Sequence, residues 1–98
     1  MILPTREVAE LFEVGTKYRV VSHNRNAVVG TRLITAIEHE EGSSTIKYIN
    51  INGGYKGGQC LTIKDVEPVN VECLSQNKIV LKFNLRGRFS YIRVQEAT

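Results

Sequence analysis

The clearest indication of the fold comes from the segment KIVLKFNLRGRFSYIRV, residues 78–94. Two runs rich in strand-forming residues, 78–85 and 88–94, flank Arg86-Gly87, and a glycine in a two-residue turn is typical of a β-hairpin. With that turn Lys82 lies opposite Tyr91, and opposed residues share one face of the sheet. The segment 77–95 is therefore predicted to form a C-terminal hairpin.

The two faces of this predicted hairpin differ in composition. One face is apolar and is assigned to the core: Ile79, Leu81, Phe83, Leu85, Ile92 and Val94. The other carries two aromatic residues among four bases: Lys78, Val80, Lys82, Asn84, Arg86, Phe89, Tyr91 and Arg93. Single-stranded nucleic acid stacks its bases on aromatic rings for about 1–3 kcal/mol each, while Lys and Arg neutralise phosphates. The second face therefore predicts a surface for nucleic acid, with single strands or RNA favoured.

Upstream of the hairpin the pattern predicts one short helix and then strands. Residues 5–14 place Val8, Leu11 and Phe12 on one helical face, with Thr5 as the N-terminal cap. Strand-like runs follow at 17–22, 31–40, 45–51 and 60–63, with an irregular corner at 64–70. The chain is thus predicted to be a single mainly β domain over 1–98, with barrel-like strands over 16–70 and five to six strands in all, which form a small barrel or a highly curved sheet.

The apolar stripe of the predicted helix opens a competing interpretation of the hairpin. Val8, Leu11 and Phe12 must pack against another element, and a sheet face with two aromatic rings is a suitable partner. In that arrangement the helix covers Phe89 and Tyr91, and the surrounding bases form an ordinary solvated rim.

Composition limits the class of protein. The 98 residues are 42% hydrophobic and 23% charged, which is ordinary for one globular domain. No apolar run approaches the roughly 20 residues that a membrane-spanning helix needs, and the N-terminus lacks the pattern of a secretory signal. The two cysteines, Cys60 and Cys73, fit buried thiols in a reducing compartment, so a cytoplasmic location is expected.

Charge is unevenly distributed along the chain. The net charge is +3 and the isoelectric point is about 9.0. Residues 1–13 hold one base and three acids, whereas residues 71–98 hold five bases and two acids. A basic C-terminal part favours nucleic acid or an acidic protein as the partner.

Four segments in the central part resemble SH3-like small barrels of the Tudor and KOW kind. They are VGTKYRV (14–20), TRLITAIE (31–38), TIKYINI (45–51) and DVEPV (65–69), which together span just over half the chain. The resemblance implies a small SH3-like or OB-like barrel, and such barrels bind nucleic acid or protein segments.

Two shorter resemblances also point to nucleic acid. RGRFSYIRV (86–94) resembles the ribonucleoprotein motif of RNA-recognition and cold-shock domains, with Phe89 and Tyr91 at its aromatic positions and Arg88 inserted after Arg86-Gly87. LPTREVAELFEV (3–14) resembles the first helix of excisionase-like and MerR-like helix-turn-helix domains. That second resemblance implies a DNA-facing helix over 16–23, with contacts from Lys17, Arg19 and Arg25. Strand formers dominate KYRVVS (17–22), so a strand is favoured there.

Other candidate sites are weaker. The loop GGYKGG (53–58) could wrap a phosphate with backbone amides, but it lacks the pattern of a P-loop. His23, His39, Cys60 and Cys73 show none of the close spacings typical of structural zinc sites. No nucleophile motif surrounds any Ser, and Glu38, Glu40 and Glu41 read as a solvated cluster at a strand end. Neither a catalytic site nor a cofactor is predicted.

These observations predict a small non-catalytic binding module for nucleic acid. The proposed surface comprises Lys82, Arg86, Arg88, Phe89, Tyr91 and Arg93, with Tyr55 and Lys56 as outer contacts. One alternative is a protein-interaction module, such as an inhibitor or accessory subunit of the phage type, that docks onto an acidic partner through a sheet edge or the basic hairpin. Another is a small-ligand or nucleotide-binding barrel that uses the loop at 53–58. The oligomeric state is left open.

Overall fold

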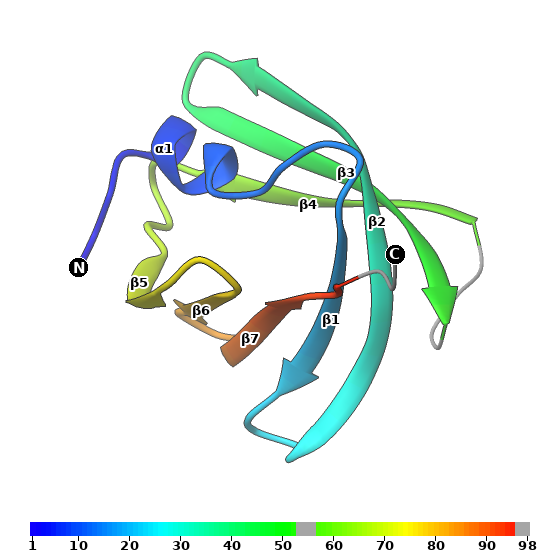
Figure 1. Ribbon diagram of the computed structural model, residues 1–98. Helices are drawn as coiled ribbons and strands as arrows, with labels where there is room; N and C mark the ends of the chain where they lie inside the picture. The colour runs from blue at the N-terminus through cyan, green and yellow to red at the C-terminus, as the bar shows by residue number, and fades with distance from the viewer. Residues whose placement is uncertain (53–56, 96–98) are drawn as a thin grey trace.

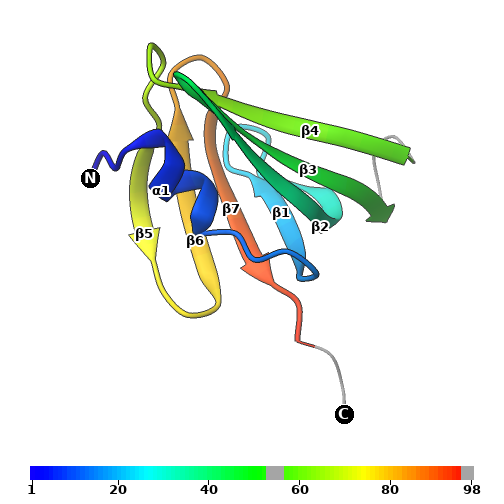
Figure 2. The same cartoon turned by 90° about the horizontal axis from the view of Figure 1, so that it is seen from above.

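The computed structural model describes residues 1–52 and 57–95 of the chain. These residues form one short helix and seven antiparallel strands: α1 (Thr5–Glu10), β1 (Lys17–Ser22), β2 (Ala27–Glu40), β3 (Ser43–Asn52), β4 (Gly57–Lys64), β5 (Asn70–Leu74), β6 (Lys78–Phe83) and β7 (Gly87–Arg93). The strands make one sheet in the order β4-β3-β2-β1-β7-β6-β5. Figures 1 and 2 show the sheet curling around α1, which lies in its hollow.

The mainly β prediction is confirmed, but the closed barrel of five to six strands is wrong. The sheet has seven strands in the described residues and is open, because its end strands β4 and β5 do not pair with each other. Instead the N-terminal residues occupy the outer edge of β5: Ile2 bridges Asn70, and Val71 N–H donates to the Met1 carbonyl at 2.7 Å. The edge that barrel closure would require is thus covered by the chain's own start.

Residues 17–22 form a strand, so the DNA-facing helix of the helix-turn-helix alternative is contradicted. The segment KYRVVS alternates, with Tyr18, Val20 and Ser22 buried on the side facing α1. It pairs with both β2 and β7 and lies in the middle of the sheet. Arg25 lies in the turn between β1 and β2.

The helix is shorter than the predicted 5–14. It ends at Glu10, so the chain can turn and bring Phe12 into the core, where its side chain is 3% exposed. Gly15 then adopts a left-handed conformation at φ +87°, and its N–H donates to the Ile34 carbonyl at 2.8 Å. The expected Thr5 cap is also wrong: the N-cap position is Pro4, no side chain caps the helix, and Thr5 is buried in the first turn.

The core lies between α1 and the inner face of the sheet, which we define as the face toward α1. Val8 and Ala9 of the helix are fully buried and belong to the same hydrophobic core as strand residues of that face, among them Val20, Ile46 and Leu81. The Phe12 ring meets Tyr18 edge-on at 5.3 Å between centroids. No helix of the described residues is long and apolar enough to cross a membrane.

Candidate nucleic-acid interface

The β6–β7 hairpin forms where it was predicted, but its turn and register differ. Ile79 pairs with Tyr91, and residues 84–86 make a three-residue turn in place of the two-residue Arg86-Gly87. Gly87 follows the turn at φ +88°, a conformation that glycine adopts without strain and that is common at the end of longer hairpin loops. The prediction placed Tyr91 opposite Lys82, which is three residues from its actual partner Ile79. A register error of an odd number of residues moves the side chains of one strand to the opposite face relative to those of the other.

This register places both aromatic residues of β7 on the inner face. Tyr91 is 4% exposed, and its ring meets Phe12 edge-on at 5.0 Å. Phe89 is half-buried and packs edge-on against Phe83 at 5.8 Å. The assignment of Phe89 and Tyr91 to the basic face of the hairpin is therefore wrong. The rings are covered, as in the competing interpretation. The ring that packs against Tyr91 belongs to Phe12, which lies in the segment after α1 and not in the helix itself.

Burial of Tyr91 also changes its acidity. Removal from water disfavours the ionised phenolate and raises the pKa of Tyr91 to about 12, although the nearby guanidinium of Arg32 acts in the opposite direction. Arg32 lies over the Tyr48 ring, with its Cζ atom 4.3 Å from the centroid. The hydroxyl of Tyr91 is thus held neutral inside the sheet.

The register also overturns three predicted core positions of the hairpin. Leu85 is 91% exposed at the turn, and Val94 is 37% exposed beyond β7. Ile92 is half-buried and lies on the outer face, opposite Arg19. The other three predicted core residues, Ile79, Leu81 and Phe83, are buried as expected.

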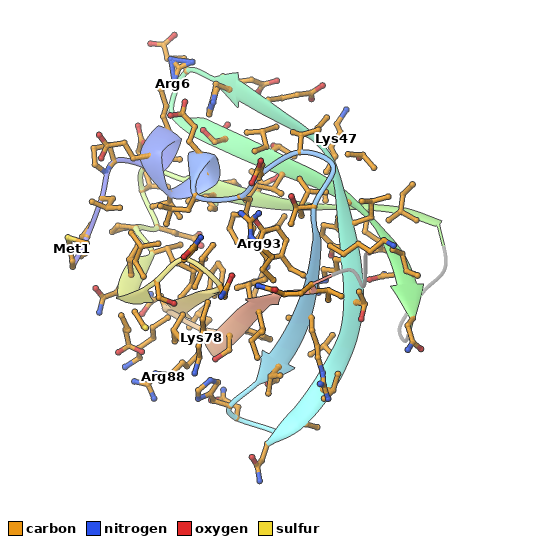
Figure 3. All side chains as sticks on the ribbon, in the orientation of Figure 1. Met1, Arg6, Lys47, Lys78, Arg88 and Arg93 are labelled. Atoms are coloured by element: carbon orange, nitrogen blue, oxygen red, sulfur yellow. The ribbon has the colours of Figure 1, made fainter. Side chains whose placement is uncertain are left out.

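Arg93 lies apart from the other predicted bases. It follows Tyr91 on the inner face, and its Nη2 atom donates to Glu13 Oε2 at 2.8 Å. Its guanidinium lies 5.9 Å from the centroid of the Tyr18 ring. The Glu13 carboxylate raises the pKa of Arg93 through this hydrogen bond. Arg93 therefore ties the segment after α1 to β7, and Figure 3 shows it near the centre of the molecule.

Four bases on the outer face of β1, β7 and β6 form two rows. In the first row Arg19 of β1 lies opposite Ile92 of β7, which lies opposite Lys78 of β6. In the second row Arg88 of β7 lies opposite Lys82 of β6. Lys78 and Lys82 are four positions apart along β6, so the rows are about 13 Å apart. Figure 3 shows Lys78 and Arg88 on the same side of the molecule.

Within the described residues, the ion pair that these bases make is between Arg88 and Glu72 of β5. Its carboxylate forms a two-point pair with Arg88, one arm of which joins Nη2 to Oε2 at 2.9 Å. Hydrogen bonding by Arg88 lowers the pKa of Glu72, and the same pair raises the pKa of Arg88. Among the described residues, Arg19, Lys78 and Lys82 have no ion-pair partner. The outer face thus keeps three uncompensated positive charges.

Acidic residues gather elsewhere. Glu7, Glu10 and Glu13 lie in or just after α1, and Glu38, Glu40 and Glu41 lie where β2 turns into β3. The two groups are neighbours, because His39 Nε2 lies 3.3 Å from Glu10 Oε1. The charge asymmetry seen along the sequence therefore becomes a separation in space, with acids around α1 and bases on the outer face.

The other predicted contacts are dispersed. Arg86 is exposed in the β6–β7 turn, where its carbonyl accepts from Asn24 Nδ2 at 3.3 Å. Tyr55 and Lys56 lie outside the described residues, and so does most of the glycine-rich loop that the small-ligand alternative would use. Of the eight predicted site residues, the structure brings Lys82 and Arg88 together on the outer face.

The histidines and cysteines are placed separately. His23 Nε2 lies 2.6 Å from Ser90 Oγ, and His39 Nδ1 lies 2.7 Å from Ser44 Oγ. Cys60 and Cys73 are free and exposed, so the expectation of buried thiols is wrong. In the described residues no three His, Cys, Asp or Glu side chains are grouped as a metal site would need.

Two residues of the outer face were missing from the predicted site. Arg19 was considered only as part of a DNA-facing helix, although alternation with Tyr18 and Val20 gives its outward direction once β1 is a strand. Lys78 was placed on the basic face of the hairpin, and its pairing with Ile92 now brings it into line with Arg19.

Comparison with known proteins adds no relative to this description. No protein-family model, no curated protein and no solved structure matches the chain. The fold and the site define a small mainly β protein with one open, strongly curved sheet and a basic outer face.

Proposed function

We propose that this protein is a non-catalytic module that binds nucleic acid through the outer face of β1, β7 and β6. The observation that supports the proposal is the pair of basic rows, Arg19 with Lys78 and Arg88 with Lys82, opposed by Glu72 alone. The phosphates of a nucleic acid attract such a surface at long range. When Lys and Arg contact the phosphates, counterions condensed on the nucleic acid are released, and this release provides affinity without recognition of the bases.

The shape of the sheet favours a flexible strand as the ligand. Duplex DNA is stiff over about 150 base pairs, so it touches a strongly curved face along a short line only. A single strand can bend and follow the curvature across both basic rows. None of the six aromatic residues in the described part of the chain is exposed, so phosphate contacts rather than stacking carry the affinity and sequence preference is weak.

The test is binding of a fluorescently labelled single-stranded oligonucleotide, as DNA and as RNA, followed by anisotropy between about 50 and about 200 mM salt. The variant Arg19→Gln/Lys78→Gln/Lys82→Gln should bind more weakly than the wild type. Each phosphate contact on a single strand contributes about 0.7 to the slope of log affinity against log salt, so losing three should reduce the slope by about 2.

The matched control is Arg6→Gln/Lys47→Gln/Lys64→Gln, which changes the net charge equally. Figure 3 shows Arg6 and Lys47 on the opposite side of the molecule from Lys78 and Arg88. This control should keep the wild-type slope. Equal losses in both variants would mean that net charge rather than this face attracts the ligand, and absence of wild-type binding would overturn the proposal.

A further inference from the structure

The two edges of the sheet differ in whether another segment covers them. The N-terminal residues cover the β5 edge, where Val71 N–H donates to the Met1 carbonyl and the Met1 ammonium group donates to the Val71 carbonyl at 3.0 Å. β4 pairs on its other side with β3, and no described segment pairs with its outer edge along the strand. An uncovered edge displays backbone groups that can hydrogen-bond to an added strand.

The phase of the β3–β4 ladder shows which backbone groups point outward. Asp65 N–H donates to the Gly42 carbonyl at 2.9 Å, in register with the ladder. Residues that bond to the neighbouring strand alternate with residues that face away, so Lys64, Thr62 and Cys60 face the outer edge. The Lys64 carbonyl already accepts from Glu67 N–H at 3.0 Å. In the described residues, the backbone groups of Thr62 and Cys60 remain without a partner.

A groove of about 470 Å³ runs beside this edge. One wall comes from β4 and includes Thr62 and Lys64, and the other comes from Phe83 and the following turn, residues 84–86. Val69 lies in the same lining. The groove therefore separates an unpaired strand edge from the β6–β7 turn, at the opening left by the unclosed sheet.

Exposed apolar side chains mark the same place. Leu85, which lines the groove, is 91% exposed, and Val66 is 83% exposed, the two highest values among the large hydrophobic residues described. Val66 lines an adjoining hollow that shares Glu67 and Phe83 with the groove. Exposed aliphatic side chains of this kind, gathered beside a free edge, are typical of a surface that another chain covers.

We propose that this groove is a docking site for an extended segment of a partner protein, which adds as a strand to the outer edge of β4. Thr62 and Cys60 supply the main-chain hydrogen bonds, and alternate apolar side chains of the segment pack on Leu85, Val69 and Phe83. Lys64 and Arg86 line the groove against Glu67 alone, so the segment carries acidic residues between its apolar ones. Arg19, Lys78 and Lys82 are not part of the groove lining, although Lys82 lines the adjoining hollow, and the inference does not depend on the proposed function.

The test uses a display library of random extended peptides, followed by synthesis of the enriched sequence and calorimetric measurement of its affinity. Enriched sequences should alternate apolar with acidic residues. Thr62→Pro removes an outward N–H but no β3–β4 hydrogen bond, and proline is tolerated at such edge positions. It should weaken peptide binding by about tenfold or more, because one hydrogen bond is lost and the ring obstructs pairing.

Thr62→Val is the matched control, because it loses the same hydroxyl, which lies 3.2 Å from Thr45 Oγ1, but keeps the N–H. It should bind within about threefold of the wild type, whereas Leu85→Asp should lose binding through charge repulsion and lost apolar contact. Val28→Asp, which changes an exposed apolar residue of β2, should not lose binding. Failure to enrich any peptide, or equal binding to Thr62→Pro and the wild type, would overturn the proposal. Concentration-dependent dimerisation that Thr62→Pro abolishes would instead assign the edge to a second copy of the chain.

Discussion

The inner and outer faces of β7 separate two kinds of side chain that lie next to each other in the sequence RGRFSYIRV. On the inner face Tyr91 is 4% exposed and packs against Phe12. On the outer face Arg88 lies beside Lys82 and pairs with Glu72. A basic and aromatic sequence therefore does not imply a basic and aromatic surface, because alternate residues of the strand lie on opposite faces of the sheet.

The largest effect should come from breaking the inner face. Tyr91→Ala removes a buried ring that contacts Phe12 and leaves a cavity, so the free energy of unfolding should fall by about 3–5 kcal/mol, the range for large aromatic side chains. Lys78→Ala on the outer face should change it by no more than about 0.5 kcal/mol. Urea unfolding followed by circular dichroism measures both. Similar small changes in the two variants would show that Tyr91 is not a core residue.

A smaller effect is expected from the turn that sets the register between the two faces. Gly87→Ala forces a side chain into the left-handed region and makes its Cβ atom clash with the side-chain amide of Asn24. Asn24 must then move and lose its hydrogen bond to the Arg86 carbonyl, so we expect a loss of about 1–3 kcal/mol. Gly58→Ala, where an added Cβ meets open space, is the control for the same measurement and should be close to neutral. Comparable effects at both glycines would contradict the described turn.

The smallest effect concerns the buried hydroxyl of Tyr91. Its pKa in the folded protein is about 12, above the ordinary value of about 10 in the unfolded chain. The resulting stabilisation is complete below about pH 10 and is lost as pH rises towards 12, at no more than about 1.4 kcal/mol per pH unit. Tyr91→Phe should flatten this decline in unfolding experiments between those values. An unchanged decline would mean that other groups produce it.

Local patterns predicted the strands better than their arrangement. KYRVVS alternates with a period of two, and β1 has the predicted bounds, Lys17–Ser22. β5 was missed because in NVECL only Val71 is a buried apolar residue, which leaves little local signal. Its place in the sheet depends on pairing with β6 and on cover by Met1 and Ile2, and the contact of Met1 with Val71 joins residues 70 apart in sequence.

The prediction of the candidate site depended on one local feature, the length of the β6–β7 turn. A two-residue turn and a three-residue turn with Gly87 behind it are both compatible with NLRG, and only packing separates them. The longer turn buries Tyr91 against Phe12 and leaves Leu85 exposed. The bases of the outer face could be predicted by residue type, but their alignment with Arg19 required the β1–β7 pairing.

The most direct test of the division between faces is a two-dimensional amide NMR titration of the wild-type protein with a single-stranded oligonucleotide at low salt. We expect the largest chemical-shift changes at Arg19, Lys78, Lys82 and Arg88, and we expect them to fade as salt is added. The amide signals of residues around Phe12 and Tyr91 should not shift. Shifts concentrated on the inner face or along the edge of β4, with the outer face unaffected, would contradict the division between faces.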